Sequence, residues 1–338
     1  MIQRRTLIAT AAASAALPAT LLTAPALGRP LRTLVHPSPQ STSYPAFLSG
    51  IRSQAIQIGV SRSILDVALA LSQPNAHVLE LDRHQPEFTL TWAQYRARVL
   101  SDRKLQAGRA AYQSRLSLLT GIWRRYQVDP RIVVGIWGLE SNFGSRSGSF
   151  GVIDSLATLA FDGRRAAFFH SELMNALRIL QQQDIAPAQM LGSYAGAMGQ
   201  PQFMPSSYLR YAVDYDGDGR RDIWSSEPDV LASIANYLSR CGWTAGAPWG
   251  QAISVPQGFD AAQGGRQNWH SLQTWTGMGV RRADGRPFTR GDVSGAVLLP
   301  DGAGGDAFMV YSNFDVIRRY NPSDFYSLAV GLLGSGAA

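Results

Sequence analysis

Residues 129–140 constrain the fold of this 338-residue chain more than any other segment. They read Asp-Pro-Arg-Ile-Val-Val-Gly-Ile-Trp-Gly-Leu-Glu: a helix-capping residue, a proline at the first helical position, and then an almost unbroken apolar run. A helix that is apolar on all sides must be surrounded by other elements, so the segment predicts a helix deep inside a sizeable core. Glu140 falls near the end of that helix.

Helical spacing of apolar residues is found on both sides of this segment. The clearest stretches before it lie at 45–51, 63–71 and 106–126, and further helices are expected at 152–160, 165–183, 228–240 and 323–333. Gly-rich turns are expected at 144–151 and 192–199. Alternating apolar residues at 295–299 and 307–311 predict strands instead. We therefore expect an α+β fold that is mainly α.

These patterns divide the chain into segments of different character. We expect an N-terminal helical region at 44–129, a core at 130–248, a small β-rich subdomain at 249–310 and a C-terminal segment at 311–338. With 45% hydrophobic residues the chain can bury such a core, as one unit or as two to three subdomains. Its single cysteine, Cys241, allows no intramolecular disulfide and is expected to be a small buried apolar residue.

The first 26 residues have the layout of an export signal. Arg4 and Arg5 precede an Ala- and Leu-rich run that reaches small residues, which fits a twin-arginine signal or an ordinary secretory signal. A membrane-spanning anchor is disfavoured because the apolar run is short and contains Pro18 and Pro25. A lipid anchor is not implied, because no cysteine lies near the expected cleavage site. Residues 27–43, rich in Pro, Ser and Thr, are expected to form a flexible mature N-terminus.

The charge of the chain favours anionic partners. The net charge is +7, and removing Arg4 and Arg5 with the signal leaves +5, since 7 minus 2 is 5. Nucleic acid and anionic cell-wall polymer both fit this bias. Because the predicted signal would export the protein, the cell-wall polymer is the favoured partner, and we expect no nucleic-acid partner.

Glu140 has the setting of an acid catalyst. Ile136, Trp137, Leu139 and Phe143 surround it in sequence, and an apolar environment disfavours ionisation, so the pKa of its carboxyl group is expected to rise. The alternative from spacing alone is that Glu140 faces solvent at a helix end.

The residues around Glu140 carry a resemblance to a known family. The string Glu-Ser-Asn-Phe-Gly at 140–144 looks like the Glu-Ser-x-x-Gly signature of lysozyme-like lytic transglycosylases. The strings at 192–208, 235–243 and 313–321 resemble the lytic murein transglycosylase B family. The resemblance implies a lysozyme-like helical core, extended by an additional helical region and a small β-rich subdomain, with the C-terminal segment closing the cleft.

The resemblance also implies a reaction. Glu140 would be the sole catalytic carboxylate, donating a proton to the glycosidic oxygen of the β-1,4 bond between N-acetylmuramic acid and N-acetylglucosamine in peptidoglycan. It would then act as base toward the muramyl 6-hydroxyl, leaving a 1,6-anhydromuramic end. Asp154 and Asp162, the nearest downstream acids, fit surface or capping groups better than a second catalytic carboxylate.

Two alternatives stay open at this stage. A lysozyme-type hydrolase would use an activated water and a second carboxylate brought near from distant sequence. A non-catalytic wall-binding scaffold would keep the site but recruit other enzymes.

Further site residues are carried over by position in the same motifs. Two of them, Ser193 and Asn321, would assist Glu140. Ser193 would form a hydrogen bond near the reacting sugar. Arg164 and Arg165 would meet a peptide or lactyl carboxylate, which suits bidentate arginine. The remaining substrate contacts implied by the resemblance are Tyr95, Gln202, Phe203, Tyr237, Tyr320 and Tyr326.

An Asp-x-Asp-x-Asp-Gly string at 214–219 matches the opening of an EF-hand loop, which arranges oxygens around a hard cation. Ser225 stands at the twelfth position, where a standard loop has a bidentate Glu. The family's loop is longer, and the resemblance implies a structural Ca²⁺ closed by Asp229. The ligand set expected is Asp214, Asp216, Asp218, the Arg220 carbonyl and Asp229; the alternative is an Asp/Gly-rich turn without metal.

No organic cofactor is expected. The partners implied are the glycan strands of peptidoglycan and, beyond them, other cell-wall enzymes. An export signal without an anchor places such an enzyme in the periplasm.

Overall fold

The computed structural model describes residues 43–70, 72–83 and 90–337. The expected export signal at 1–26 and all but the last residue of the expected flexible segment at 27–43 lie outside the described residues. The fold is mainly helical with a small antiparallel sheet, as the sequence predicts. Among the described helices, none has the length and apolar character needed to cross a membrane.

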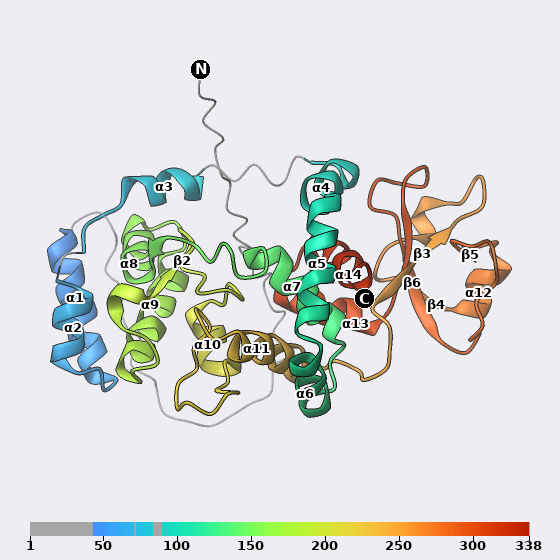
Figure 1. The fold of residues 1–338 in the computed structure, drawn as a ribbon. Coiled ribbons are helices and arrows are strands. Elements are labelled where there is room, and N and C mark those ends of the chain that lie inside the picture. Colours follow the sequence, from blue (N-terminus) through green and yellow to red (C-terminus); the bar gives the residue numbers. More distant parts are fainter. Residues whose placement is uncertain (1–42, 71, 84–89, 338) are drawn as a thin grey trace, which may run out of the picture.

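The helices before the buried segment pack in two different places (Figure 1). α1, α2 and α3 pack on α8 and α9, whereas α4, α5 and α6 pack on α7, α11 and α14. The bounds are α1 (Tyr44–Gln57), α2 (Arg62–Ala68), α3 (Ala76–Arg83), α4 (Trp92–Val99), α5 (Asp102–Ser114), α6 (Leu116–Tyr126), α7 (Pro130–Ser141), α8 (Val152–Asp162), α9 (Ala166–Gln181), α10 (Pro205–Tyr211), α11 (Glu227–Arg240), α12 (Leu272–Gly277), α13 (Ser312–Tyr320) and α14 (Asp324–Ser335).

The long helix expected at 106–126 is interrupted at Arg115. α5 ends at Ser114 and α6 begins at Leu116, because Arg115 leaves helical geometry with φ −117° and ψ 16°. Its guanidinium group forms two hydrogen bonds with Glu227, of 2.5 and 2.6 Å, and lies 4.8 Å from the centre of the Trp137 ring. These contacts come from residues distant in sequence, so local apolar spacing could not predict the break.

α7 is the buried helix that the sequence predicts. Asp129 caps it by accepting the N–H of Arg131, and every residue from 132 to 141 is buried. α14 runs antiparallel along it at very short distance. A Cβ added to Gly135 would lie 2.5 Å from the Val330 carbonyl oxygen, and one added to Gly334 would lie 2.5 Å from the Arg131 carbonyl oxygen. The two backbones can touch only because both positions are glycine.

A five-stranded antiparallel sheet lies at one end of the molecule, with α1, α2, α8 and α9 toward the other end (Figure 1). Its strand order is β4-β6-β7-β3-β5, and it encloses a separate small apolar core that includes Trp275 and Met309. The strands are β3 (Gly250–Ser254), β4 (Trp269–Ser271), β5 (Arg281–Arg282), β6 (Ser294–Leu298) and β7 (Ala307–Val310). A two-stranded ladder joins β1 (Phe150–Gly151) to β2 (Leu191–Gly192).

The α7–α14 contact predicts a specific destabilisation. Gly135→Ala should lower the free energy of unfolding by about 3 kcal/mol, because the new methyl group meets a backbone carbonyl that cannot move aside. Gly50→Ala in α1 is the control: a Cβ there meets nothing within 4 Å, and replacing a helical glycine should raise stability by about 0.5–1 kcal/mol. Chemical denaturation measures both, and equal effects would contradict the close approach.

Candidate active site

Glu140 lies at the end of α7 and is only 8% exposed. The helix stops one residue later because Asn142 and Phe143 adopt left-handed backbone conformations with φ of 51° and 58°. The Ser141 hydroxyl accepts the N–H of Gly144 at 3.1 Å and steadies this ending. The expected buried position of Glu140 is confirmed, and the solvent-facing alternative is wrong.

The phenol of Tyr326 donates a hydrogen bond to Oε1 of Glu140 at 2.6 Å. Tyr326 stands in the first turn of α14, whose cap residue Ser323 accepts the Tyr326 N–H at 3.3 Å. Burial, reinforced by the negative charge of Glu140, raises the pKa of Tyr326 and of nearby Tyr320 well above the usual value. Both phenols therefore stay protonated at neutral pH.

Ser193 occupies a tight turn that is joined to the end of α7. The chain after α7 leads into β1, which pairs with β2, and Ser193 directly follows β2. Ser193 is 2% exposed, and its Oγ accepts the N–H groups of Ala195 at 3.3 Å and Ala197 at 3.1 Å. With both acceptor positions in use, the hydroxyl hydrogen is the part of this group that is left to bind another molecule.

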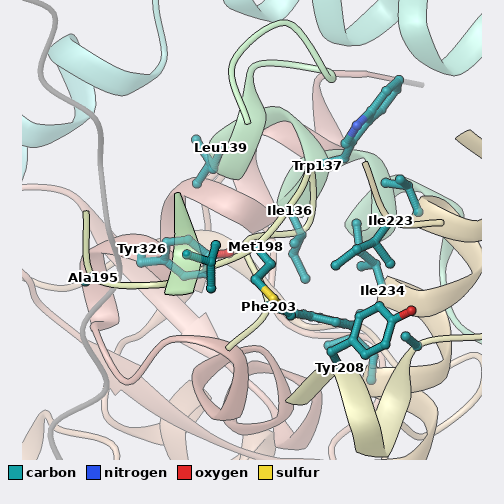
Figure 2. Close-up of a cluster of buried hydrophobic side chains, with 14 of the residues drawn as sticks. Ile136, Trp137, Leu139, Ala195, Met198, Phe203, Tyr208, Ile223, Ile234 and Tyr326 are labelled. Carbon is teal, nitrogen blue, oxygen red and sulfur yellow. The ribbon is translucent and has the colours of Figure 1, made fainter. Parts of the chain in front are cut away.

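Gln202 ties the same turn to the segment after Glu140. Its left-handed backbone has φ 52°, and its amide nitrogen donates to the carbonyls of Ser147 at 3.0 Å and Gly199 at 2.7 Å. Figure 2 shows a cluster of buried side chains in which Met198 and Phe203 of the turn lie with Ile136 and Leu139 of α7.

An aromatic cluster connects the turn to the C-terminal helices. The ring centre of Phe203 lies 5.8 Å from those of Tyr237 and Tyr320, which are 4.7 Å apart. Tyr320 donates to the Pro201 carbonyl at 2.6 Å. Phe203 is only 2% exposed, so in this structure its ring is packed beneath the surface, and its expected contact with a sugar face stays a prediction.

Asn321 and Tyr95 approach the same region from other elements. Asn321 ends α13, and its side-chain oxygen accepts the N–H of Ser323 at 3.1 Å, directly before α14. Tyr95 of α4 packs against Phe325, the neighbour of Tyr326, with ring centres 5.8 Å apart. The fold thus gathers residues from α4, α7, the 192–203 turn, α13 and α14.

The acidic loop before α11 brings together three of the five expected cation ligands. Carboxylate oxygens of Asp214, Asp216 and Asp229 lie within 4.8 Å of one another. Asp229 is fully buried, and burial raises the pKa of its carboxyl group to about 6 even though backbone N–H groups of the loop hydrogen-bond to it. Asp218 lies outside this cluster and pairs with the Arg220 side chain at 2.9 Å.

Comparison with known proteins decides the family. The family model described as transglycosylase SLT domain matches residues 43–335. The chain belongs to this transglycosylase family. It is 34% identical to the membrane-bound lytic murein transglycosylase B of Escherichia coli strain K12 over 253 residues, which are 73% of this chain and 67% of that protein.

Solved structures of similar transglycosylases share the fold. SltB3 from Pseudomonas aeruginosa, solved with NAG-anhNAM-pentapeptide, is 44% identical and superposes with a TM-score of 0.85 over 88% of this chain and 80% of its own. Slt35 from Escherichia coli, solved with calcium, is 28% identical with a TM-score of 0.74 over 89% of this chain and 98% of its own.

In this transglycosylase, Arg164 and Arg165 are both bound to Asp82 of α3. Arg164 donates through Nε to Oδ2 at 3.0 Å, and Arg165 donates to Oδ1 at 2.7 Å. Asp82 is 3% exposed, so this ion pair fastens α3 to the start of α9. Binding of a substrate carboxylate by the two arginines stays a prediction, and their contacts with Asp82 do not favour it.

Lys104 is a residue near the site that motif reasoning missed. It lies in the first turn of α5, partly buried, where burial and the positive charge of Arg146 lower its pKa to about 8 while Glu140 acts in the opposite direction. One signal was available: Lys104 is the only lysine in the sequence.

The Asp82 ion pair gives a prediction. Asp82→Asn should lower the free energy of unfolding by about 2–3 kcal/mol, because it leaves two arginines without their buried partner. Asp162→Asn, at an ion pair whose Arg83 side chain is 60% exposed, should cost under about 1 kcal/mol. Urea titrations of both variants provide the measurement, and a neutral Asp82→Asn would show that the pair contributes nothing.

Proposed function

We propose that the chain cleaves the β-1,4 bond between N-acetylmuramic acid and N-acetylglucosamine in peptidoglycan and leaves 1,6-anhydromuramic ends. The observation that carries this is the buried Glu140 at the end of α7, held by the Tyr326 phenol, in a chain of the transglycosylase family. SltB3, solved with NAG-anhNAM-pentapeptide, is a relative bound to a fragment with such an end.

Glu140 serves as both acid and base in this proposal. A protonated Glu140 gives its proton to the glycosidic oxygen as the bond to the muramyl C1 breaks, and the resulting carboxylate then removes the proton of the muramyl 6-hydroxyl as that oxygen bonds to C1. The proton lost in the first step is regained in the second, so no water is consumed. The hydrogen bond from Tyr326 fixes the direction of the carboxyl group for both transfers.

A single catalytic carboxylate distinguishes this reaction from hydrolysis by a pair of carboxylates. Four other acidic side chains are buried among the described residues, and each is engaged elsewhere. Asp82 binds two arginines, Glu172 binds Ser206, Asp184 binds Arg221, and Asp229 in the first turn of α11 lies with Asp214 and Asp216 of the acidic loop. This arrangement supports the transglycosylase over the lysozyme-type hydrolase.

Ser193 and Asn321 are proposed to assist Glu140. The Ser193 hydroxyl, whose acceptor positions are filled by Ala195 and Ala197, would donate to an oxygen of the bound sugar. Asn321, whose oxygen is held by Ser323, would offer its amide N–H groups. Aromatic surface around the sugar would come from Tyr95, Tyr237 and Tyr320. Gln202 would hold the turn rigid through its hydrogen bond to the Ser147 carbonyl.

The acidic loop is proposed to hold a structural Ca²⁺. The donor set of Asp214, Asp216 and Asp229 consists of hard oxygens, which suits this ion, and a fully buried Asp229 carboxylate is costly to leave without a cation. Slt35, a relative solved with calcium, supports the choice of ion. When bound, the ion would neutralise these carboxylates and fix the loop to α11, without a part in the reaction.

The proposed setting is the periplasm, reached through the predicted export signal at 1–26. The +5 charge that remains without the two signal arginines suits an anionic wall polymer as partner. Contacts with other cell-wall enzymes remain part of the proposal.

Glu140→Gln should reduce the rate of muropeptide release by about 10²–10⁴-fold, because the amide can neither give nor take the proton. The wild type should release anhydromuropeptides from purified peptidoglycan, each one water lighter than the hydrolysed product, as read by mass spectrometry. Glu80→Gln, the same change at a carboxylate on α3, should leave the rate unchanged. Reducing-end products from the wild type would make the enzyme a hydrolase, and binding without any product would favour a scaffold.

Calcium at about 100 times its dissociation constant should raise the free energy of unfolding by about 2.7 kcal/mol. Asp214→Ala should abolish the accompanying rise in Tm, since this residue belongs to the carboxylate cluster. Asp218→Ala tests whether Asp218 is a further ligand. If calcium still raises the Tm of this variant, Asp218 is not a ligand, and if the rise in Tm is lost, it is one. A Tm that changes with neither calcium nor chelator would exclude the ion.

A further inference from the structure

Lys104 is the only lysine in the chain, and its position is unfavourable for a cation that serves only structure. It is the third residue of α5, and the partial positive charge at the N-terminal end of a helix repels a cation there. Its side chain is partly buried, which further disfavours the ammonium ion. Its ammonium group forms no hydrogen bond or ion pair with any residue that the structure describes.

Lys104 stands on a helix that packs against the segment carrying Glu140. One turn further along α5, a Cβ at Gly108 would lie 3.5 Å from Phe143, and Phe143 belongs to the segment that directly follows Glu140. Glu140 and Arg146 both lie near enough for their charges to act on Lys104.

Arg146 comes from the same segment, six residues after Glu140. Its backbone N–H donates to the Ser141 carbonyl at 2.8 Å, which fixes Arg146 next to the end of α7. Its side chain is exposed and, like that of Lys104, is in no ion pair among the described residues. Two unpaired cations and the positive end of α5 thus adjoin a site for a negatively charged polymer.

We propose that Lys104 and Arg146 bind a carboxylate of the peptide stem on the muramic acid residue and so determine the preference for stem-bearing strands. This rests on the proposed function, because it takes peptidoglycan as the substrate. Arg164 and Arg165, the pair that the family motifs suggest for such a carboxylate, are occupied by Asp82. Lys104 and Arg146 are available instead, and a carboxylate would supply the ion-pair partner that Lys104 does not have among the described residues.

Steady-state kinetics on two forms of the same strands test the proposal. One form keeps its peptide stems, and the other has lost them to an amidase. Lys104→Met, which keeps the length of the side chain but removes the charge, should raise KM on the stem-bearing strands about tenfold or more. On stem-free strands its KM should match that of the wild type, and kcat should change little on either form.

Three variants accompany this measurement. Arg146→Gln should repeat the selective rise in KM, and Lys104→Arg should restore most of the affinity because it keeps the charge. Arg103→Gln, at the exposed neighbour of Lys104 in α5, should behave as wild type on both forms. An equal loss by Lys104→Met on both forms would overturn the proposal, since it would mean that Lys104 acts through Glu140, the sugar or the lactyl carboxylate that the amidase leaves on the muramic acid.

A second readout does not depend on activity. Because Lys104 is the only lysine, an amine acetylating reagent modifies one side chain, and mass spectrometry of the α5 peptide follows it. NAG-anhNAM-pentapeptide should slow this acetylation severalfold, whereas the same disaccharide without peptide should not. Equal protection by both fragments, or by neither, would overturn the proposal. Failure of the wild type to form anhydro products would instead refute the proposed reaction, and the protection assay would still test Lys104.

Discussion

The backbone contact between α7 and α14 is the interaction on which the site depends. Gly135 and Gly334 allow the two helices to approach until a carbonyl of one lies where a side chain of the other would stand. At this distance the first turn of α14 meets the last turn of α7, and Tyr326 reaches Glu140. A wider spacing would break this hydrogen bond to a buried carboxyl group, which is costly in an apolar core.

The fold was predictable where a local pattern matched its surroundings. The apolar run at 129–140 forms α7, and the alternating stretches near 295 and 307 form β6 and β7. The break at Arg115 was not predictable, because the contacts that accompany it, with Glu227 and Trp137, come from residues distant in the sequence. The sequence also did not indicate that, within the expected region 44–129, α1–α3 and α4–α6 pack on different helices. Apolar spacing shows which face of a helix is buried but not which element covers it.

The site was predictable in its central residue and less so in its supports. The sequence around Glu140 indicates both its burial and its position at a helix end. The contact of Arg164 and Arg165 with Asp82 crosses more than 80 positions, and nothing local to the arginines indicates it. Lys104 shows the converse case: it belongs to no motif, yet the composition alone distinguishes it as the single lysine of the chain.

The hydrogen bond between Glu140 and Tyr326 spans 186 positions of the chain. Such a contact closes a very long loop, and the entropic cost of closing it must be offset by the packing of α7 against α14. A chain in which α14 has not docked has the carboxyl group but lacks the hydrogen bond from Tyr326 and the packing of α14 against α7. The described setting of Glu140 therefore needs the last helix of the chain to be folded against a helix near its middle.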